Sequence, residues 1–291
     1  NAIVETVTGT PNITLTGLDD FSTYNLQVYN CENYVSANFT TLMACPDGVI
    51  CIGSGTATSN YLPANNYYKY SLTEQIYTAD EIGEAGAILS IAFYKNATTE
   101  MIKNLDIYMM STTVNAFTGT SDWIVPTASD LVYSGQVTFA DNAWTTIELD
   151  VPFIYDGTNN VVVLVNNKTG AYKINTPFFV YSASENNQSI YFYQDGSAEL
   201  DPTAPSASNS GVTAQKNFIR LVVGEPPSCL KPIGVTASSV TAHEATITWT
   251  SDADAWQVQL SDEDPIDVTD ATYTFDGLDP ETTYSVKVRA N

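Results

Sequence analysis

Short runs of β-branched and aromatic residues recur along most of the chain, and clusters rich in Gly, Asn and Asp separate them. Examples are ILSIAFY (88–94), NLDIYMM (104–110), NVVVLVN (160–166), SIYFYQ (189–194) and ATITWT (245–250). β-Branched and aromatic residues are favoured in β-strands, and Gly, Asn and Asp are favoured in the turns between strands. Only TADEIGEAG (78–86) carries a helical signal, with Thr78 as a possible N-cap and Glu81 as its capping-box partner. The pattern predicts an all-β chain with the strand spacing of sandwiches or barrels.

Two distant segments repeat one pattern, a strand followed by Gly-Leu-Asp, a Tyr and a second alternating strand. They are ITLTGLDDFSTYNLQVYNC (13–31) and YTFDGLDPETTYSVKVRAN (273–291). Gly277 and Tyr284 lie 260 positions after Gly17 and Tyr24, so no gap is needed to align the copies. Self-similarity at a fixed spacing is typical of repeat architectures. We expect the chain to be one period of a longer tandem array.

The repeated segment resembles the E strand, corner and F strand of fibronectin type III domains. The resemblance implies that Tyr24 and Tyr284 are tyrosine-corner residues whose hydroxyls bond to nearby backbone. Before the second copy, the sequence also supplies an A strand, a B strand with Trp249 and a C strand that begins at Trp256. We expect residues 226–291 to form a fibronectin type III domain without its last strand, and residues 1–44 the C-terminal part of another.

The central segment, residues 45–225, is longer than an immunoglobulin-like domain, and about ten to twelve strands are expected in it, which fits a two-sheet jelly roll. Its strand order resembles the lectin-like jelly-roll modules that alternate with fibronectin domains in large bacterial surface adhesins. These include the cleaved-adhesin type in proteins exported by the type IX route. The resemblance implies a secreted or cell-surface protein of a Gram-negative bacterium, in contact with neighbouring repeats of the same long chain.

The four cysteines favour an oxidising compartment. They include no CxxC pair and have no His partners nearby in the sequence, which argues against zinc. Cys45 and Cys51 could close a small disulfide loop. In the fibronectin alignment, Cys31 and Cys229 would pair with cysteines outside the present sequence. Structural disulfides indicate a secreted or surface protein, and four free thiols in the cytosol are the alternative.

Charge limits the possible partners. The chain has 10 Lys and Arg against 33 Asp and Glu, a formal net charge of −23. Such an excess repels phosphates and anionic lipid, which argues against nucleic acid and the membrane surface. The sequence also has no apolar run of about 18 residues, so we expect no membrane insertion.

One acidic loop is a candidate calcium site. The stretch DGSAELDPTAP (195–205) places Asp195, Glu199 and Asp201 on a turn-rich segment. Calcium prefers such oxygen ligands, although the EF-hand spacing is missing. The alternative is that acidity serves solubility alone.

Catalysis has little support in the sequence. A nucleophilic triad needs an imidazole, and the single histidine, His243, follows the A strand of the predicted C-terminal fibronectin domain. A glycosidase needs two carboxylates, but no motif marks such a pair. We therefore expect a protein that is not an enzyme.

Aromatic residues in turn-rich places favour sugar binding. Sugars stack their CH faces on exposed rings and pair their hydroxyls with polar side chains. The predicted ligand-binding residues are Tyr67, Tyr68, Trp123 with the adjacent Asp122, and Tyr193; Tyr61 and Tyr70 belong to the same YLPANNYYKY stretch. The alternative is that these rings are ordinary core or edge cover, as in most β-sandwiches.

The combined features favour a non-catalytic surface adhesin. Its central sandwich would bind a glycan or a protein ligand on a surface, and the fibronectin modules would act as spacers. Two alternatives stay open. The chain is a purely structural stalk or filament repeat, or it is an accessory binding region of a secreted protease or glycosidase.

Overall fold

A computed structural model describes residues 13–18, 22–30, 33–183, 186–196, 198–206, 208–225, 230–251 and 253–290. The described residues form an all-β structure, with 50% strand and 3% helix, as predicted. It divides into two compact units, Asn1–Asp47 and Gly48–Asn291. Cys31 and Cys229 lie outside the described residues, and so do their predicted pairings.

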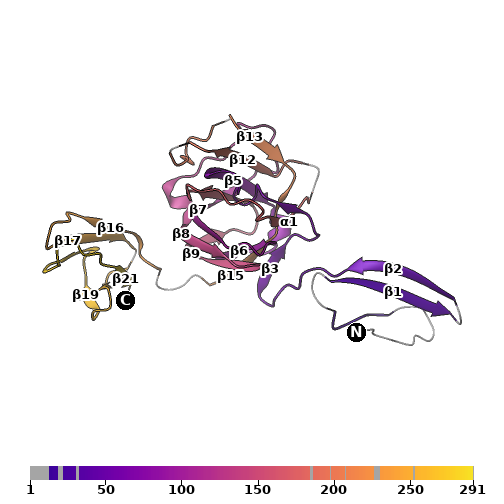
Figure 1. Cartoon of the computed structure of the whole chain (residues 1–291), viewed down its shortest axis with the longest axis horizontal. Coiled ribbons are helices and arrows are strands. Elements are labelled where there is room, and N and C mark those ends of the chain that lie inside the picture. The colour runs from indigo at the N-terminus through magenta and orange to yellow at the C-terminus, as the bar shows by residue number, and fades with distance from the viewer. Residues whose placement is uncertain are drawn as a thin grey trace. The chain divides into compact units, whose positions relative to one another are not determined.

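The described strands of the N-terminal unit form one hairpin. Strand β1 (Thr23–Asn30) pairs antiparallel with β2 (Asn33–Thr40) (Figure 1). Tyr24 stacks on Phe39 across the hairpin with ring centroids 5.7 Å apart. The residues that would form the tyrosine corner before Tyr24 lie outside the described part. The predicted F strand is thus present as β1, whereas residues 13–16, predicted as the E strand, form no strand. The assignment of residues 1–44 to a fibronectin type III domain stays a prediction.

Two antiparallel sheets face each other in the central segment. The six-stranded sheet has the order β13-β12-β5-β10-β7-β8. Its strands are β5 (Tyr70–Tyr77), β7 (Met101–Thr112), β8 (Leu131–Phe139), β10 (Asn160–Asn167), β12 (Ser189–Gln194) and β13 (Ser210–Thr213). The seven-stranded sheet has the order β14-β11-β6-β15-β3, with β4 beside β11 and β9 beside β6. Its strands are β3 (Val49–Ile52), β4 (Thr58–Ser59), β6 (Gly86–Lys95), β9 (Ala143–Tyr155), β11 (Phe178–Tyr181), β14 (Lys216–Asn217) and β15 (Ile219–Gly224).

The described residues also include two short helical segments outside the sheets, α1 (Ala79–Ile82) and a 3-10 turn at Ala128–Asp130. The predicted capping partner is present, because Glu81 Oε2 accepts from the Thr78 backbone N–H at 2.8 Å. The Glu81 carboxylate also accepts from Lys216 Nζ at 2.6 Å and from the Tyr181 hydroxyl at 2.7 Å. The Glu81 side chain thus caps the start of the helix and ties it to β14 and β11. In the described part of the chain, no helix has the length and hydropathy needed to cross a membrane.

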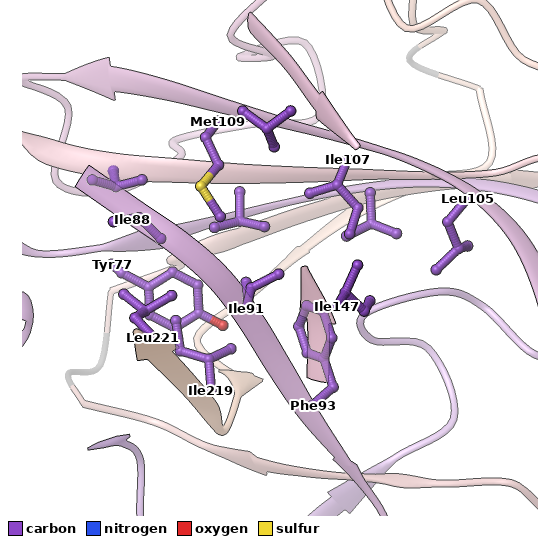
Figure 2. Packing of buried hydrophobic residues seen from close by; sticks show 14 of the residues in the cluster. Tyr77, Ile88, Ile91, Phe93, Leu105, Ile107, Met109, Ile147, Ile219 and Leu221 are labelled. Carbon is purple, nitrogen blue, oxygen red and sulfur yellow. The ribbon is translucent and has the colours of Figure 1, made fainter. Parts of the chain in front are cut away.

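The main core lies between the two sheets. Figure 2 shows Leu105, Ile107 and Met109 of β7 on one side, with Ile91 and Phe93 of β6 across from them. Alternation along each strand sends every second side chain into this layer. In strand β10 all eight residues are buried, including those that point away from this layer. Its second face must therefore be covered as well.

Loops cover that second face and form an outer cluster. Val162 and Leu164 of β10 pack there with Phe117 and Leu200, which come from the loops after β7 and after β12. Glu74 of β5 lies between Leu164 and Ile190 in the strand register and is fully buried. The outer cluster thus encloses one carboxyl group in apolar surroundings.

The C-terminal module has two three-stranded sheets. Strands β16 (Ile233–Ser238), β17 (Ala245–Thr250) and β20 (Thr272–Phe275) form one, and β19 (Ile266–Val268), β18 (Trp256–Leu260) and β21 (Val286–Ala290) form the other. Trp249 and Trp256 meet edge to face between them, with centroids 5.8 Å apart. The Tyr284 hydroxyl accepts from the Asp279 backbone N–H at 2.9 Å, which confirms the predicted tyrosine corner.

Truncation of a side chain in the main core should strongly destabilise the central sandwich. Phe93 is fully buried, so Phe93→Ala removes its packing and leaves a cavity. We expect a loss of about 3–5 kcal/mol in the free energy of unfolding, measured by urea denaturation. Ile154 on β9 is 65% exposed, and Ile154→Ala should change stability by less than about 0.5 kcal/mol. Equal effects of the two substitutions would contradict the assigned core.

Glu74 should make stability depend on pH. Its Oε2 accepts from the Ile124 backbone N–H at 3.0 Å, and its Oε1 is buried without a hydrogen-bond partner among the described residues. Burial raises the pKa of Glu74 to about 8. The folded protein therefore holds a proton that the unfolded chain releases between about pH 4.5 and 8, so stability falls as pH rises through this window.

Glu74→Gln keeps the acceptor for Ile124 N–H and removes the ionisation. We expect the variant to gain stability over the native protein from pH 5 to pH 9, by an amount on the order of a few kcal/mol at the upper end. Thermal unfolding across this pH range measures the effect. The exposed Glu148→Gln should leave the profile unchanged. Parallel profiles for Glu74→Gln and the native protein would refute this account of the buried carboxyl.

Candidate functional site

Two tyrosines of β12 share one face of the six-stranded sheet. Tyr191 and Tyr193 are two positions apart, so their side chains point the same way, and their ring centroids lie 6.2 Å apart. Tyr191 pairs in register with Gly211 of β13. A Cβ atom at Gly211 would lie only 2.3 Å from the Tyr191 hydroxyl, so the ring occupies the space above this glycine.

Three further tyrosines reach this face from the segment between β4 and β5. Tyr61 stacks near-parallel with Tyr191 at 6.4 Å and lies 5.9 Å from Tyr67. Tyr68 stacks on Tyr193 at 4.1 Å. The five rings form one continuous series, which we call the tyrosine row: Tyr67, Tyr61, Tyr191, Tyr193 and Tyr68.

Buried polar contacts hold the segment that carries Tyr61, Tyr67 and Tyr68. The Asn65 backbone N–H donates to Ser71 Oγ at 2.9 Å, and Asn66 Nδ2 donates to the Thr176 carbonyl oxygen at 2.9 Å. Asn65 and Asn66 are both fully buried. Buried hydrogen bonds of this kind fix the segment against β5 and the 168–176 loop, and so they fix the positions of the three rings.

The tyrosine row is open to solvent. Tyr61 is 49% and Tyr67 39% exposed, and the other three rings are half-buried. Partial burial, together with the neighbouring Tyr193 and Asp195, raises the pKa of the Tyr68 hydroxyl. Desolvation also raises the pKa of Tyr191. These hydroxyls therefore stay protonated at neutral pH and can both donate and accept hydrogen bonds.

Tyr67, Tyr68 and Tyr193 of the predicted residues thus come together, and Tyr61 joins them. Tyr191 was missed, although the alternation in SIYFYQ already places it on the same strand face as Tyr193.

Trp123 and Asp122 do not belong to the row. Trp123 packs against the outer cluster, which also contains Ile190 and Phe192. These two residues alternate with Tyr191 and Tyr193, so Trp123 and the row lie on opposite faces of the sheet.

Asp122 organises its own loop instead. Its Oδ2 accepts from the backbone N–H groups of Thr118 and Gly119 and from the Thr118 hydroxyl. These bonds lower the pKa of Asp122, with the Thr118 hydroxyl as the main cause.

The three predicted calcium ligands do not converge on one point. Asp195 Oδ1 accepts from the Lys69 backbone N–H at 3.0 Å, and Asp201 Oδ1 accepts from the Thr203 backbone N–H at 2.8 Å. Glu199 lines a separate hollow. Within the described ranges, no group of three His, Cys, Asp or Glu side chains is arranged to hold a metal ion.

That hollow lies on the outer face of β7 and β8 and measures about 250 Å³. Two of its lining residues, Ser134 and Lys168, bind the neighbouring Asp106, whose Oδ1 accepts from Ser134 Oγ at 2.6 Å and from Lys168 Nζ at 2.7 Å. The lining is polar throughout: Asn104, Ser134, Gly135, Gln136, Lys168 and Glu199. The hollow offers hydrogen bonds to a small polar molecule, but its lysine is already paired.

The predicted disulfide between Cys45 and Cys51 is present. Cys51 lies on the edge strand β3, opposite Arg220 of β15. The bond closes the short loop at the start of the central sandwich.

His243 takes part in the packing of the C-terminal module. Its Nδ1 lies 2.8 Å from the carbonyl oxygen of Leu278, close to the tyrosine corner. The side chain is exposed. These contacts fit a structural role.

Comparison with known proteins identifies one module. Residues 226–291 match the fibronectin type III domain family. No curated protein matches the sequence. The match confirms the predicted C-terminal fibronectin type III module, a kind of domain typical of extracellular proteins, where it has binding or structural roles.

Proposed function

We propose that the central sandwich binds an uncharged glycan along the tyrosine row, without catalysis, as the binding module of a secreted or surface-attached adhesin. The observation that carries this proposal is the continuous series of five tyrosine rings on one strand face and its covering segment. Small-molecule sites combine aromatic lining with a few well-placed polar groups. Five hydroxyls and the nearby Asp195 supply such polar groups here.

Rigidity supports a binding role for the row. Tyr191 and Tyr193 belong to β12, and the segment with Tyr61 is held by buried asparagines. A tyrosine has few rotatable bonds, so its immobilisation costs little entropy when it binds. Preorganisation of this kind improves affinity because the ordering cost is met during folding.

Charge supports an uncharged ligand. The chain carries a formal net charge of −23, and Asp195 lies close enough to Tyr68 to raise its pKa. A polyanionic glycan would meet repulsion near the row, at distances shorter than the screening length of about 8 Å at physiological salt. Neutral sugars avoid this cost.

The position of the row in the sandwich suits a tethered binding module. Strand β5 begins beside the row, because Ser71 pairs with Tyr193. It ends near α1 and the start of β6, where Ala87 pairs with Gly224 at the end of the last strand. The eight residues of β5 span about 23 Å. The row therefore lies at the end of the sandwich opposite to the point where the chain leaves it.

The surface location has two supports. The Cys45–Cys51 disulfide favours an oxidising compartment. The fibronectin type III module is typical of extracellular proteins. Export by the type IX route and a tandem array with neighbouring repeats stay predictions from the resemblance. A purely structural stalk is the main alternative, and it predicts no glycan binding.

Glycan binding by the full chain tests the proposal. We expect uncharged polysaccharides to bind on an array, with affinity then measured by titration calorimetry. Tyr61→Ala and Tyr193→Ala should each weaken binding about tenfold, which corresponds to about 1.4 kcal/mol. Tyr34→Ala is the control, because Tyr34 is 57% exposed, belongs to the N-terminal hairpin and lies outside the row.

Three outcomes would count against the proposal. The full chain binds no uncharged glycan, the row variants bind as tightly as the native protein, or Tyr34→Ala weakens binding as much as Tyr61→Ala does. Product analysis of the incubated glycan checks the absence of catalysis, since shortened chains would show an enzyme.

A further inference from the structure

Another hollow lies at the same end of the six-stranded sheet as the tyrosine row. Strand β12 ends at Gln194, which pairs with Tyr70 at the start of β5. Strand β10 ends at Asn167, which pairs with Leu105 of β7. Beside the start of β7 lies a pocket of about 210 Å³, lined by residues from 100–103 and 169–173, which we call the β7 pocket. The row and the β7 pocket therefore share one end of the sheet.

The loop between β10 and β11 connects the row with the β7 pocket. The Gly170 backbone N–H donates to the Lys69 carbonyl oxygen at 3.2 Å. The Lys173 backbone N–H donates to the Asn66 carbonyl oxygen at 2.8 Å. Asn66 and Lys69 flank two adjacent tyrosines of the row in the sequence. The loop thus runs beside this part of the row, while its own side chains line the pocket.

The β7 pocket presents apolar surface to solvent. Tyr172 is 63% and Ile102 is 42% exposed, and both line the pocket together with the exposed Ala171. Exposed apolar surface with polar residues around it often marks a ligand-binding groove. The pocket is smaller than a drug-sized site, so it suits one unit of a longer ligand.

The polar groups that a ligand can reach suit an uncharged, hydroxyl-rich unit. Glu100 and Lys173 are exposed and supply one negative and one positive charge, and Thr169 adds a hydroxyl. The Lys103 ammonium group is buried, so a ligand in the pocket does not reach it. The reachable charges therefore balance, and all three groups can bind sugar hydroxyls while a CH face packs on Tyr172.

The distance between the two parts of this surface favours a chain over a single sugar. Strands β12, β5, β10 and β7 are successive neighbours in the sheet. Three strand spacings separate β12 from β7, which is about 14 Å. One sugar unit cannot cover this distance, but an extended chain can. A β-1,4-linked glucose chain is straight and flat, because its linkages are equatorial, whereas an α-1,4-linked chain coils.

We propose that the tyrosine row and the β7 pocket form one track for an unbranched, uncharged, β-1,4-linked glycan chain, with Tyr172 as the ring between them. This inference rests on the proposed glycan binding by the row, and it adds the class of glycan and a second part of the site. A chain held by the row brings its next units close to the pocket, so the second contact forms without a new association step.

Calorimetric titration of the full chain with cellotriose and cellohexaose tests the track, because these two β-1,4-linked glucose chains differ only in length. We expect cellohexaose to bind at least about tenfold more tightly, since it alone reaches both parts of the track. Maltohexaose has the same number of glucose units with α-1,4 linkages. It should bind at least about tenfold more weakly than cellohexaose, because straightening a coiled chain costs free energy.

Two variants separate the track from the row. Tyr172→Ala should weaken cellohexaose binding about tenfold, which corresponds to about 1.4 kcal/mol, and leave cellotriose binding unchanged. Tyr193→Ala should weaken the binding of both chains, because Tyr193 belongs to the row. Tyr172 is exposed, so its truncation should not lower the melting temperature. Tyr34→Ala on the N-terminal hairpin is the control and should change neither affinity.

Four results would overturn the track. Cellohexaose does not bind, it binds no more tightly than cellotriose, maltohexaose binds as tightly as cellohexaose, or the folded Tyr172→Ala variant keeps the native affinity for cellohexaose. The row is judged separately on the glycan array. If another uncharged glycan binds there and Tyr61→Ala weakens it, the row stands although the track fails, whereas no binding of any uncharged glycan removes both.

Discussion

The burial of strand β10 on both faces is the constraint on which the central domain depends. Val161, Val163 and Val165 belong to the layer between the sheets, and Val162 and Leu164 belong to the outer cluster. The seven-stranded sheet covers one face of β10, and the loops after β7 and after β12 cover the other. The tyrosine row lies instead on β12, the second strand from the edge of the sheet, and on the segment before β5.

Local patterns predicted much of this fold. Runs such as ILSIAFY and NVVVLVN form β6 and β10, as their β-branched and aromatic residues predicted. The corner at Tyr284 and the small disulfide loop were also predictable, since both close within a few positions. The two-residue strands β4 and β14 could not be predicted, because they exist only through pairing with β11.

The candidate sites depend on contacts that a linear pattern does not contain. Tyr61 meets Tyr191, and Asn66 binds Thr176 more than a hundred positions away. The nearby Asp and Pro residues suggest that Trp123 lies in an exposed loop. In the structure, Trp123 instead packs on the apolar face of β12 and β5, as part of the outer cluster.

The pairing of β3 with β15 sets how the central sandwich would respond to tension. These are its first and last strands, they run antiparallel, and Val49 lies opposite Val222. A pull on the two chain ends therefore opens the strand pair like a zipper, one hydrogen bond after another, and does not slide the strands past each other. The Cys45–Cys51 bond shifts the first loaded point from Val49 to Cys51, so the outermost rungs of the ladder are shielded from the force.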